Sequence, residues 1–256
     1  MRHPQRWFST LLLCLLAVVT PLAWATTANN SEETAEMIHQ QGILAWKENQ
    51  LSVALYEFSR AIDKDPTQAR FYLDRGGAKI ELGYYEQSLE DLDKALALEP
   101  NYKAKVYHNK GAAYDRLEQY EDALYWFREE LKVTPQNPEA LFAIGSVYQS
   151  LGREEEANAE YTKAIKLHPY QARFYNNRGN TYKHLDDPKT AMNDYTKAIE
   201  LDPSYSDPYL NRGYLHYYYS QTPELRHQPT NRFLHWVLGT IDLLMYASLT
   251  EEPESI

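Results

Sequence analysis

The chain has little cysteine, no excess of positive charge and none of the short motifs that mark common catalytic folds. Cys14 is the single cysteine in 256 residues, so the rest of the chain can form neither a disulfide nor a thiolate metal site. Lys and Arg number 26 against 36 for Asp and Glu, and the net charge of −10 argues against a general binder of nucleic acid. GxxxxGK, HExxH and GxSxG motifs are absent, so nucleotide-loop, zinc-protease and serine-hydrolase chemistry have no signature here.

The histidines and acidic clusters also lack the spacing that metal binding or catalysis requires. No two histidines after residue 25 stand four residues apart, the spacing that would place two ligands on one helix face. A solvated helix surface explains acidic runs such as 154–156. The sequence therefore predicts a protein that is not an enzyme and holds no cofactor and no metal. The histidines concerned are His39, His108, His168, His184, His216, His227 and His235.

Residues 1–25 have the pattern of a secretory signal peptide. Two arginines precede an apolar stretch over 11–19, and Ala23-Trp24-Ala25 fits a small-x-small cleavage site. An uncleaved anchor helix is the alternative, although this stretch is shorter than the roughly 20 residues that span a bilayer, and Pro21 follows it. We expect export to a periplasm or to the outside of the cell, with an endoplasmic-reticulum lumen as the other destination. Residues 26–34 are expected to be a flexible lead-in.

Six glycines recur at an almost constant interval along the chain. Successive members stand 34, 35, 34, 34 and 34 residues apart. A fixed period of this length is typical of an array of stacked structural units. The six are Gly42, Gly76, Gly111, Gly145, Gly179 and Gly213.

Each of the first five glycines is followed by the same order of residue types. A small residue comes twelve positions later, a second one seven after that, and a proline five later still. A bulky apolar residue stands four positions after the first small one, and these i, i+4 relations predict helices that end near the prolines. Glu130 departs from the pattern because it replaces the second small residue of the third motif. The bulky residues are Phe58, Leu92, Phe127, Tyr161 and Tyr195, and the prolines are Pro66, Pro100, Pro135, Pro169 and Pro203.

This order of residues resembles the tetratricopeptide-repeat (TPR) family, in which 34 residues form two antiparallel helices. The resemblance implies an all-α fold, a right-handed superhelical solenoid of stacked helix-turn-helix pairs. We expect five full motifs and a partial sixth, followed by a linker and a C-terminal hydrophobic helix with a short acidic tail in 221–256. The expected motifs are 35–68, 69–102, 104–137, 138–171, 172–205 and 206–220.

In such arrays the first helix of each pair lines an inner groove, and this predicts where a ligand would bind. The relevant positions stand six, three and two before each glycine and one, four and five after it. The third and fifth motifs place basic and amide side chains there, and the fourth places less polar ones between them. Amides can bind the backbone of an extended peptide, and Lys or Arg can pair with a carboxylate. The predicted peptide-groove residues are Lys105, His108, Asn109, Arg116, Phe142, Ser146, Gln149, Arg173, Asn176, Asn177, Asn180 and Lys183.

Two pairs in this set are spaced i, i+4 on one helix face, Lys105 with Asn109 and Arg173 with Asn177. Each pair could hold an acidic group or form a solvated surface, and the sequence leaves both interpretations open. The two-carboxylate clamp that the family's chaperone-tail binders use is matched only in part, because the first motif lacks the required Lys and Asn. We therefore do not predict that clamp.

The sixth motif changes character after Gly213. Pro223 and Pro229 interrupt its expected second helix, and an apolar helix is predicted over 231–249. We expect this helix to fold back as a cap on an aromatic face of the array. Self-association or docking of a partner is the first alternative, and a membrane span is the second. The aromatic face consists of Tyr214, Tyr217, Tyr218 and Tyr219.

The predicted C-terminal helix carries a narrow polar stripe. His235, Gly239 and Asp242 stand at i, i+4 and i+7, and the residues between them are mostly apolar. An acidic residue inside a membrane span is costly, so the stripe argues against lipid on every side.

Together these features predict a non-catalytic protein-interaction module or assembly adaptor. Its partner would be a protein, bound in the groove as an extended peptide or a helix, and not a nucleic acid. The C-terminal helix could also mediate homo-oligomer formation or contact a membrane. The alternative is a membrane-tethered accessory protein of a cell-envelope machine, anchored through an uncleaved N-terminal segment or the C-terminal one.

Overall fold

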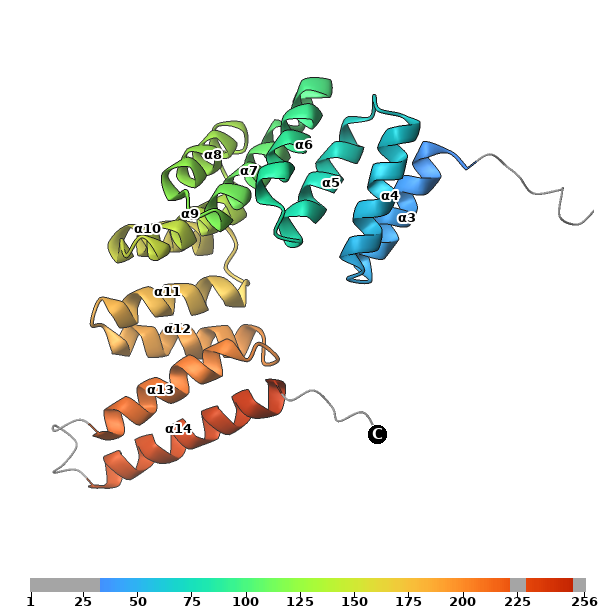
Figure 1. Ribbon diagram of the computed structural model, residues 1–256. Helices are drawn as coiled ribbons and strands as arrows, with labels where there is room; N and C mark the ends of the chain where they lie inside the picture. The colour runs from blue at the N-terminus through green and yellow to red at the C-terminus, as the bar shows by residue number, and fades with distance from the viewer. Residues whose placement is uncertain (1–32, 222–228, 251–256) are drawn as a thin grey trace, which may run out of the picture. The chain divides into compact units, whose positions relative to one another are not determined.

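A computed structural model describes residues 33–221 and 229–250 (Figure 1). In these residues it contains twelve α-helices and one short 3-10 helix, and no strand. The prediction of an all-α fold is therefore confirmed. The predicted signal peptide, residues 1–25, and most of the lead-in 26–34 lie outside the described residues.

The helices form antiparallel hairpins, each made of a first helix and a second helix, and the chain divides into two compact units. The first unit, Met1–Thr67, contains the hairpin of α3 (Ala35–Lys47) and α4 (Leu51–Lys64). The second unit, Gln68–Ile256, contains five hairpins and a 3-10 helix, Pro100–Tyr102. Its hairpins are α5 (Ala69–Glu81) with α6 (Tyr85–Leu98), α7 (Lys103–Arg116) with α8 (Tyr120–Val133), α9 (Pro138–Ser150) with α10 (Glu154–Leu167), α11 (Ala172–His184) with α12 (Pro188–Leu201), and α13 (Asp207–Gln221) with α14 (Pro229–Thr250).

The sequence signals that end the helices act where they were expected. The second helices α4, α6, α8, α10 and α12 each end two residues before a motif proline, whose ring cannot continue a helix. Inside each of the first five hairpins, the residue seven positions after the motif glycine has a left-handed backbone, with φ between 58° and 83°. Glycine adopts this conformation without cost at two of the five turns. The five turn residues are Asn49, Gly83, Glu118, Gly152 and Asp186.

The motif glycines let the two helices of a hairpin cross closely. A Cβ atom added to Gly145 would lie 2.7 Å from a ring carbon of Tyr161, and one added to Gly179 would lie 2.7 Å from a ring carbon of Tyr195. Both rings are completely buried. The space that glycine leaves is therefore filled by the bulky residue sixteen positions later.

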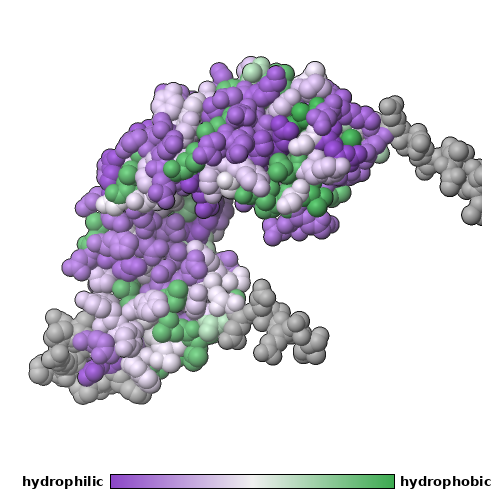
Figure 2. All heavy atoms as spheres, in the orientation of Figure 1, coloured by the Kyte–Doolittle hydropathy of each residue, from purple (hydrophilic) through white to green (hydrophobic). Residues whose placement is uncertain are grey.

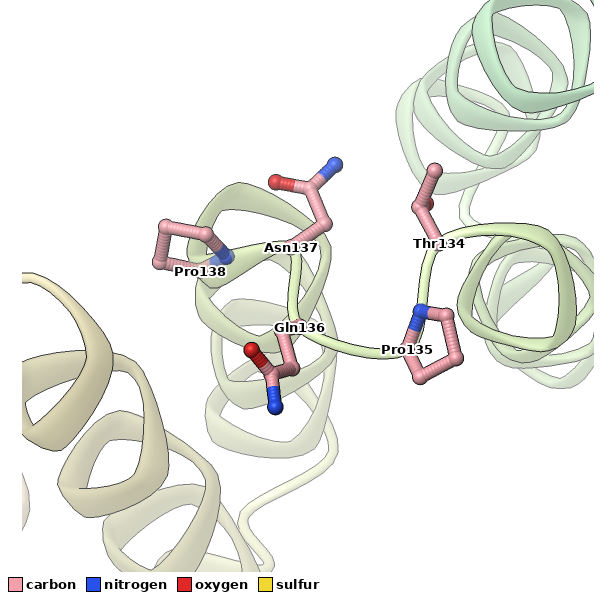
Figure 3. Close-up of a pocket in the computed structure, with 5 residues that line it drawn as sticks. All are labelled: Thr134, Pro135, Gln136, Asn137 and Pro138. Atoms are coloured by element: carbon pink, nitrogen blue, oxygen red, sulfur yellow. The ribbon is translucent and has the colours of Figure 1, made fainter.

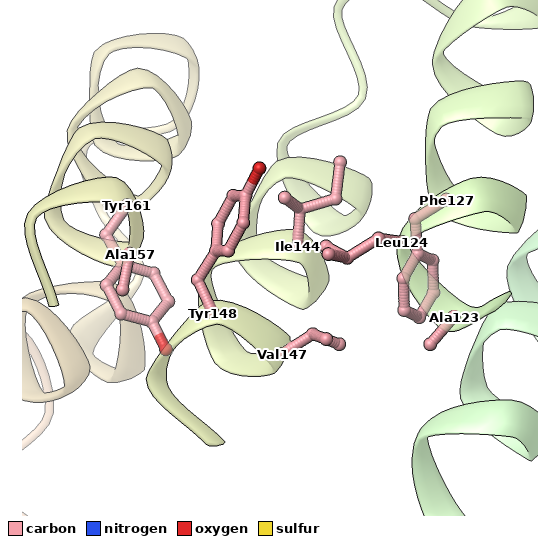
Figure 4. Packing of buried hydrophobic residues seen from close by; sticks show 8 residues of the cluster. All are labelled: Ala123, Leu124, Phe127, Ile144, Val147, Tyr148, Ala157 and Tyr161. Carbon is pink, nitrogen blue, oxygen red and sulfur yellow. The ribbon is translucent and has the colours of Figure 1, made fainter. Parts of the chain in front are cut away.

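The hydrophobic core continues from one hairpin to the next within the second unit. Figure 4 shows one such region, where side chains of α8, α9 and α10 pack together. The first helix α9 is thus covered by the second helix of its own hairpin and by that of the preceding one. The cluster consists of Ala123, Leu124, Phe127, Ile144, Val147, Tyr148, Ala157 and Tyr161.

Glu130, the departure from the small-residue pattern, is buried and fully bonded. His108 Nδ1 lies 3.0 Å from Glu130 Oε2, and Asn137 Nδ2 donates to Glu130 Oε1 at 2.6 Å. Asn137 also caps α9 by accepting from the backbone N–H of Glu139 at 3.0 Å. A buried carboxylate is tolerated only when such partners surround it, so this motif replaces close apolar packing with a polar link between α7, α8 and α9.

The helix α14 packs along α13 as the second helix of a sixth hairpin (Figure 1). Arg212 donates from Nε and Nη2 to the two oxygens of Asp242 at 2.9 and 2.7 Å. Arg178 binds Asp194 in the same way in the fifth hairpin, with both distances 2.8 Å. Each arginine directly precedes its motif glycine, so the two pairs occupy the same place in their hairpins.

The contacts of the motif glycine Gly213 place α14 in the same register against its first helix as the second helices of the earlier hairpins. A Cβ added to Gly213 would lie 3.1 Å from Leu243 Cγ and 3.2 Å from the carbonyl oxygen of Gly239. Gly76 has the same two kinds of neighbour in the second hairpin, a leucine at 3.2 Å and a backbone oxygen at 3.4 Å. Gly239 therefore takes the place of the first small residue, and Leu243 takes the place of the bulky one.

The C-terminal helix is longer than expected and begins at Pro229, where a first-turn proline loses no helical hydrogen bond. It folds back as expected, but on a different face of α13. Its polar stripe of His235, Gly239 and Asp242 is turned towards α13: Asp242 is buried, and a Cβ on Gly239 would lie 3.0 Å from a backbone oxygen of Gly213. None of the helices in the described parts of the chain is long and apolar enough to span a membrane.

The aromatic face predicted to receive this helix is mostly left open, and that part of the prediction is wrong. Tyr214, Tyr217 and Tyr218 are all more than half exposed. The ring of Tyr219 contacts α14 through the His235 ring, at a centroid distance of 5.6 Å. The glycines and the polar stripe set the packing face, because they allow a closer approach of the two helices than four tyrosines would.

Candidate functional site on the first-helix face

The first helices of the second unit form one continuous surface. Each of α5, α7, α9 and α11 contacts the next first helix directly, in addition to the second helices that pack against it. The surface that α5, α7, α9, α11 and α13 share, which we call the groove face, carries the positions that the sequence predicted as a peptide groove. Side chains from consecutive motifs meet there, 34 residues apart along the chain.

A cluster of hydroxyl and amide groups lies in the middle of the groove face. The hydroxyl of Tyr161 passes beneath α9, where it lies 3.2 Å from Ser146 Oγ and 3.1 Å from Gln149 Oε1. Asn177 of α11 faces the same hydroxyl. Burial raises the pKa of Tyr161, so the hydroxyl stays protonated and acts as a donor.

The next motif repeats this arrangement. Tyr195 donates its hydroxyl to Asn180 Oδ1 at 2.8 Å, and burial raises the pKa of Tyr195 as well. In both motifs the residue that follows the glycine therefore accepts a hydrogen bond from the hydroxyl of the tyrosine beneath it. In the described residues, the side-chain nitrogens of Gln149 and Asn180 donate to no acceptor, so both can donate to a ligand.

The predicted less polar centre is an aromatic stack. Phe142 stacks on Phe174 at a centroid distance of 5.0 Å and lies tilted against Tyr161 at 5.4 Å. The guanidinium of Arg173 lies 4.8 Å from the Phe142 ring. Arg173 also pairs with Glu139, which stands at the same motif position one repeat earlier. An incoming carboxylate would have to compete with Glu139 for this arginine, so the Arg173 and Asn177 pair is not a free anion site.

Asn176 is buried and does not reach a ligand. Its amide donates to the hydroxyl of Tyr205 at 3.2 Å and accepts from Asn211 Nδ2 at 3.0 Å, which links α11 to α13. Burial raises the pKa of Tyr205 to about 12, so this hydroxyl also stays protonated. The position of Asn176 relative to Gly179 could not show that this side chain is buried, because its partners, Tyr205 and Asn211, lie outside the helix α11.

The third motif contributes basic side chains, of which Arg116 interacts electrostatically with the adjacent Asp115. In the described part of the chain, no hydrogen bond or ion pair engages the side chains of Lys105, Asn109 or Arg116. Lys183 of the fifth motif is exposed and equally free within those residues. His108 is half-buried and bound to Glu130, so its role is mainly structural. The Lys105 and Asn109 pair is therefore the anion site that the geometry retains.

The groove face also carries an acidic group. Asp115 stands four residues after Gly111, at the position that Gln149 and Lys183 occupy in later motifs. It is half-buried, and desolvation raises the pKa of its carboxyl against the opposing charge of Arg116. A ligand amine or amide that donated a hydrogen bond to this carboxylate would offset part of the cost of its desolvation.

Three exposed tyrosines extend the groove face to α13. Tyr214, Tyr217 and Tyr218 stand one, four and five residues after Gly213, the spacing that defines groove positions in the earlier motifs. They were not predicted as groove residues because they were assigned to the packing of the last helix. The same register rule, applied to the sixth motif, would have found them.

Two pockets lie at loops between hairpins, and the second of them includes Arg173 of the groove face. One, of about 570 Å³, lies beside the loop from α8 to α9 (Figure 3). Its lining comes from five consecutive residues of one loop, so it brings no chemistry together from different elements. The other, of about 520 Å³, adjoins the ends of α10 and α12. The residues of the first are Thr134, Pro135, Gln136, Asn137 and Pro138, and those of the second are Tyr170, Gln171, Ala172, Arg173, Leu201, Asp202 and Tyr205.

Two histidines that are distant in sequence meet between α13 and α14. His216 Nδ1 lies 2.9 Å from His235 Nδ1, and burial lowers the pKa of His216. This distance requires one of the facing nitrogens to be an unprotonated acceptor. Over residues 33–221 and 229–250, no group of three or more His, Cys, Asp or Glu side chains could hold a metal ion.

The fold and the glycine register define a helical-repeat protein, and comparison with protein families gives the family. Models described as "Tetratricopeptide repeat" match residues 172–205, 69–102 and 104–137, and one described as "TPR repeat" matches residues 145–186. Together these matches cover half of the chain. The chain belongs to the tetratricopeptide-repeat family.

Relatives with curated descriptions match only a part of the chain. Hsp70-Hsp90 organizing protein 3 of Arabidopsis thaliana is 32% identical over 107 residues, which is 42% of this chain and 19% of that protein. A protein SGT1 homolog of Oryza sativa subsp. japonica is 38% identical over 79 residues, which is 31% of this chain and 21% of that protein. The chain therefore spans about a fifth of the length of the curated relatives it matches.

Solved structures share the fold at low sequence identity. A thermophilic TPR protein of Thermus thermophilus aligns with a TM-score of 0.62 and 21% identity, over 71% of this chain and 98% of that one. MamA from Desulfovibrio magneticus RS-1, from residue 41 to its end, aligns with a TM-score of 0.57 and 24% identity, over 66% of this chain and 96% of that one.

Proposed function

We propose that this protein is a protein-interaction module that holds an extended segment of a partner along the groove face. The single observation that carries the proposal is the meeting of Ser146, Gln149 and Asn177 around the Tyr161 hydroxyl. These four side chains come from three helices of two motifs, and the partly exposed polar groups of Ser146, Gln149 and Asn177 meet at the hydroxyl of the buried Tyr161, where the groove face adjoins the core. Convergent polar groups of this kind bind and orient a ligand.

The side chains of the groove face suit a peptide. Amide groups such as those of Gln149 and Asn180 can pair with a peptide backbone regardless of its sequence. Lys105 with Asn109 would hold an acidic side chain or a terminal carboxylate. The exposed Tyr217 and its two neighbours in α13 would bind apolar or aromatic residues of the partner, because tyrosine offers a large contact area at low conformational cost. The groove face therefore combines general backbone recognition with two places for specific side chains.

The curated relatives agree with a role in binding other proteins. The Arabidopsis relative is named as an organizing protein for Hsp70 and Hsp90, and this chain matches part of it at 32% identity. We propose the coarser role, binding of a protein partner, without carrying over the identity of those partners. The membrane-tethered alternative is not proposed, since no observation favours it.

We also propose that the protein acts outside the cytoplasm, in a periplasm or after secretion. The support is the pattern of residues 1–25, in which an apolar stretch ends at Ala23-Trp24-Ala25. N-terminal sequencing of the protein from its source cell would test this proposal. A mature chain that begins near Thr26 is expected, and a chain in the cytoplasm that still begins at Met1 would contradict it.

Photocrosslinking in the source cell tests the groove. A photoreactive phenylalanine analogue would replace Lys183 on the groove face of α11 in one variant of the full chain and Lys166 on α10 in the other. Both lysines are exposed, and neither forms a hydrogen bond or ion pair with its side chain in the described residues, so the second is a matched control. We expect a discrete set of protein adducts from position 183 and none of them from position 166.

A second pair of substitutions shows whether the amide cluster contributes to binding. Gln149→Ala with Asn177→Ala should lower the yield of the position-183 adducts at least about tenfold, which corresponds to the loss of two hydrogen bonds to a partner. The same adducts from both crosslinking positions, or none from position 183, would show that the groove face is not the binding surface.

A further inference from the structure

The last helix presents an apolar stripe to solvent along one flank, about a quarter turn around the helix from its polar stripe. Leu234, Leu238, Ile241 and Met245 are all exposed, with Ile241 at 50% of its full accessible surface. Leu244 beside them is exposed at 65%. We call the first four residues the α14 stripe. Figure 2 shows apolar residues towards the C-terminal end of α14, whereas polar residues dominate the surface over α11 and α12.

The register of the sixth hairpin makes this stripe unusual. Gly239 and Leu243 occupy the places of the first small and the bulky residue, so each position of α14 has a counterpart in the other second helices. The positions of Leu238, Ile241 and Met245 are polar, charged or small in the preceding hairpins of the second unit, apart from one exposed tyrosine. The counterparts are Gln87, Glu90 and Lys94 in α6, Asp122, Tyr125 and Glu129 in α8, Glu156, Ala159 and Lys163 in α10, and Thr190, Asn193 and Lys197 in α12.

These counterparts also show that the stripe is not a place for a further repeat. The side of a second helix that the next hairpin covers is occupied in α10 by Ala164 and Ile165, which pack against Phe174. The stripe positions lie on a different side, which the preceding hairpins of the second unit leave to polar residues. An exposed apolar surface of this kind marks an interaction site and not the end of a stack.

The spacing of the stripe is that of a helix seam. Its members stand four, three and four residues apart, as core positions do in paired helices. This order reads the same in both directions. In an antiparallel pair of two copies of α14, Leu234 of each copy would therefore face Met245 of the other, and Leu238 would face Ile241. A two-fold interface requires this self-complementarity.

The charges of α14 favour a second copy of this chain over a lipid surface as the partner of the stripe. Arg232 and Asp242 are the two charged residues of α14, and Asp242 is buried against Arg212. The chain as a whole carries −10, so two copies repel over most of their surface but not along this helix. A helix that lies on a lipid surface carries Lys and Arg along its polar side. The polar stripe of α14 instead faces α13, which argues against lipid.

We propose that the α14 stripe is a homodimer interface, in which two copies of this chain pair their last helices antiparallel about a two-fold axis. The helix has 22 residues and is about 33 Å long. A seam of one such helix is smaller than the roughly 800 Å² per partner of a standard interface. A dissociation constant in the micromolar range is therefore expected.

Charge exchange along the stripe tests this proposal with the full chain. The acidic variant is Leu238→Glu with Ile241→Glu, and the basic variant is Leu238→Lys with Ile241→Lys. Sedimentation equilibrium should show a dimer for the unchanged protein at about 100 µM, and each variant alone should dissociate at least about a hundredfold more readily, because like charges would face each other across the axis. An equimolar mixture of the two variants should form a one-to-one heterodimer, which native mass spectrometry would identify.

The control places the same kind of charge on another second helix. Ala159→Glu beside the native Glu156 gives α10 acidic residues at the matching positions, and it should leave the dimer unchanged. Circular dichroism should show equal helix content in all variants, since the substituted stripe side chains are exposed. A monomeric unchanged protein at that concentration, a dimer that both variants leave intact, or capture of the monomer by vesicles of phosphatidylcholine and phosphatidylglycerol would overturn the proposal.

Discussion

The fifth and sixth hairpins pack their two helices alike, yet their second helices differ on the surface that this packing leaves free. Arg178 with Asp194 and Arg212 with Asp242 form the same two-pronged ion pair. Each arginine also reaches a threonine of the preceding second helix, at 3.3 Å in the fifth hairpin and 3.1 Å in the sixth. The contacts that define a hairpin therefore involve few positions.

The difference lies in the connection and in the outer surface. Ala191 stands twelve residues after Gly179, whereas Gly239 stands twenty-six after Gly213, so the sixth hairpin contains a longer connection. The outer positions of α12 are polar, and those of α14 are apolar. We conclude that the glycine, the arginine and their partners maintain the hairpin, while the outer positions remain open to another role, here association.

Removal of the arginine should have the largest effect on either hairpin. Arg212→Met leaves Asp242 buried without its partner and should lower the free energy of unfolding by about 3–5 kcal/mol. Addition of Asp242→Leu should restore most of this loss, because no buried charge would remain. Urea unfolding followed by circular dichroism measures both. A double variant no more stable than the single one would show that the pair does more than satisfy its own charges.

Substitution of the motif glycines should lower the free energy of unfolding by less than removal of the arginine does, and by different amounts in the two hairpins. Gly179→Ala forces a Cβ into the Tyr195 ring, which is buried and bonded to Asn180, and should cost about 1–3 kcal/mol. Gly213→Ala meets Leu243 at 3.1 Å and the carbonyl oxygen of Gly239 at 3.2 Å, which are looser contacts than the Tyr195 ring, and alanine favours the helix by about 1 kcal/mol, so the loss should be smaller than at Gly179, below about 1 kcal/mol. The same urea experiment compares them. Equal losses at both sites would contradict the packing described for the sixth hairpin.

The smallest of the expected effects is a pH dependence of stability that arises from His216 in the sixth hairpin. Burial lowers the pKa of His216, and His235 and Arg212 lower it further, while Asp242 opposes them. The folded chain then binds a proton less readily than the unfolded one. The stability present above about pH 6.5 is lost as the pH falls towards the pKa of the folded state.

The variant His216→Gln isolates this effect from the titration of other groups. The melting temperature should fall less between about pH 7.5 and about pH 5.5 in the variant than in the unchanged protein. His184→Gln is the control, since that side chain is exposed and pairs with Glu154 on α10. An equal fall in all three proteins would assign the pH dependence to other groups.

The sequence predicts the hairpins well because the contacts that form them are local and repeat. Gly145 and Tyr161 stand sixteen residues apart, and the same relation recurs in every full motif, so one pattern is read five times. The proline positions predict the helix ends for the same reason. The sixth hairpin was not found because a longer connection shifts its second helix out of this register.

The groove was predictable only in outline. The register places Gln149 and Asn177 on one face, and the structure brings them to one hydroxyl. The register cannot show that Arg173 binds Glu139 or that Asn176 is buried, since both depend on contacts with neighbouring motifs. Tyr217 and its neighbours were within reach of the register rule, but the apolar helix that follows suggested a packing role for them.

Amide hydrogen exchange along α12 and α14 of the full chain tests most directly whether the last helix completes a sixth hairpin. If it does, the amides in the centre of α14 should be protected to within about tenfold of those of α12, and Arg212→Met should lower protection in α14 much more than in α12. Exchange of α14 more than about a hundredfold faster than α12 in the unchanged protein would contradict the account, because a helix held by the arginine pair and the glycine crossing cannot open so readily.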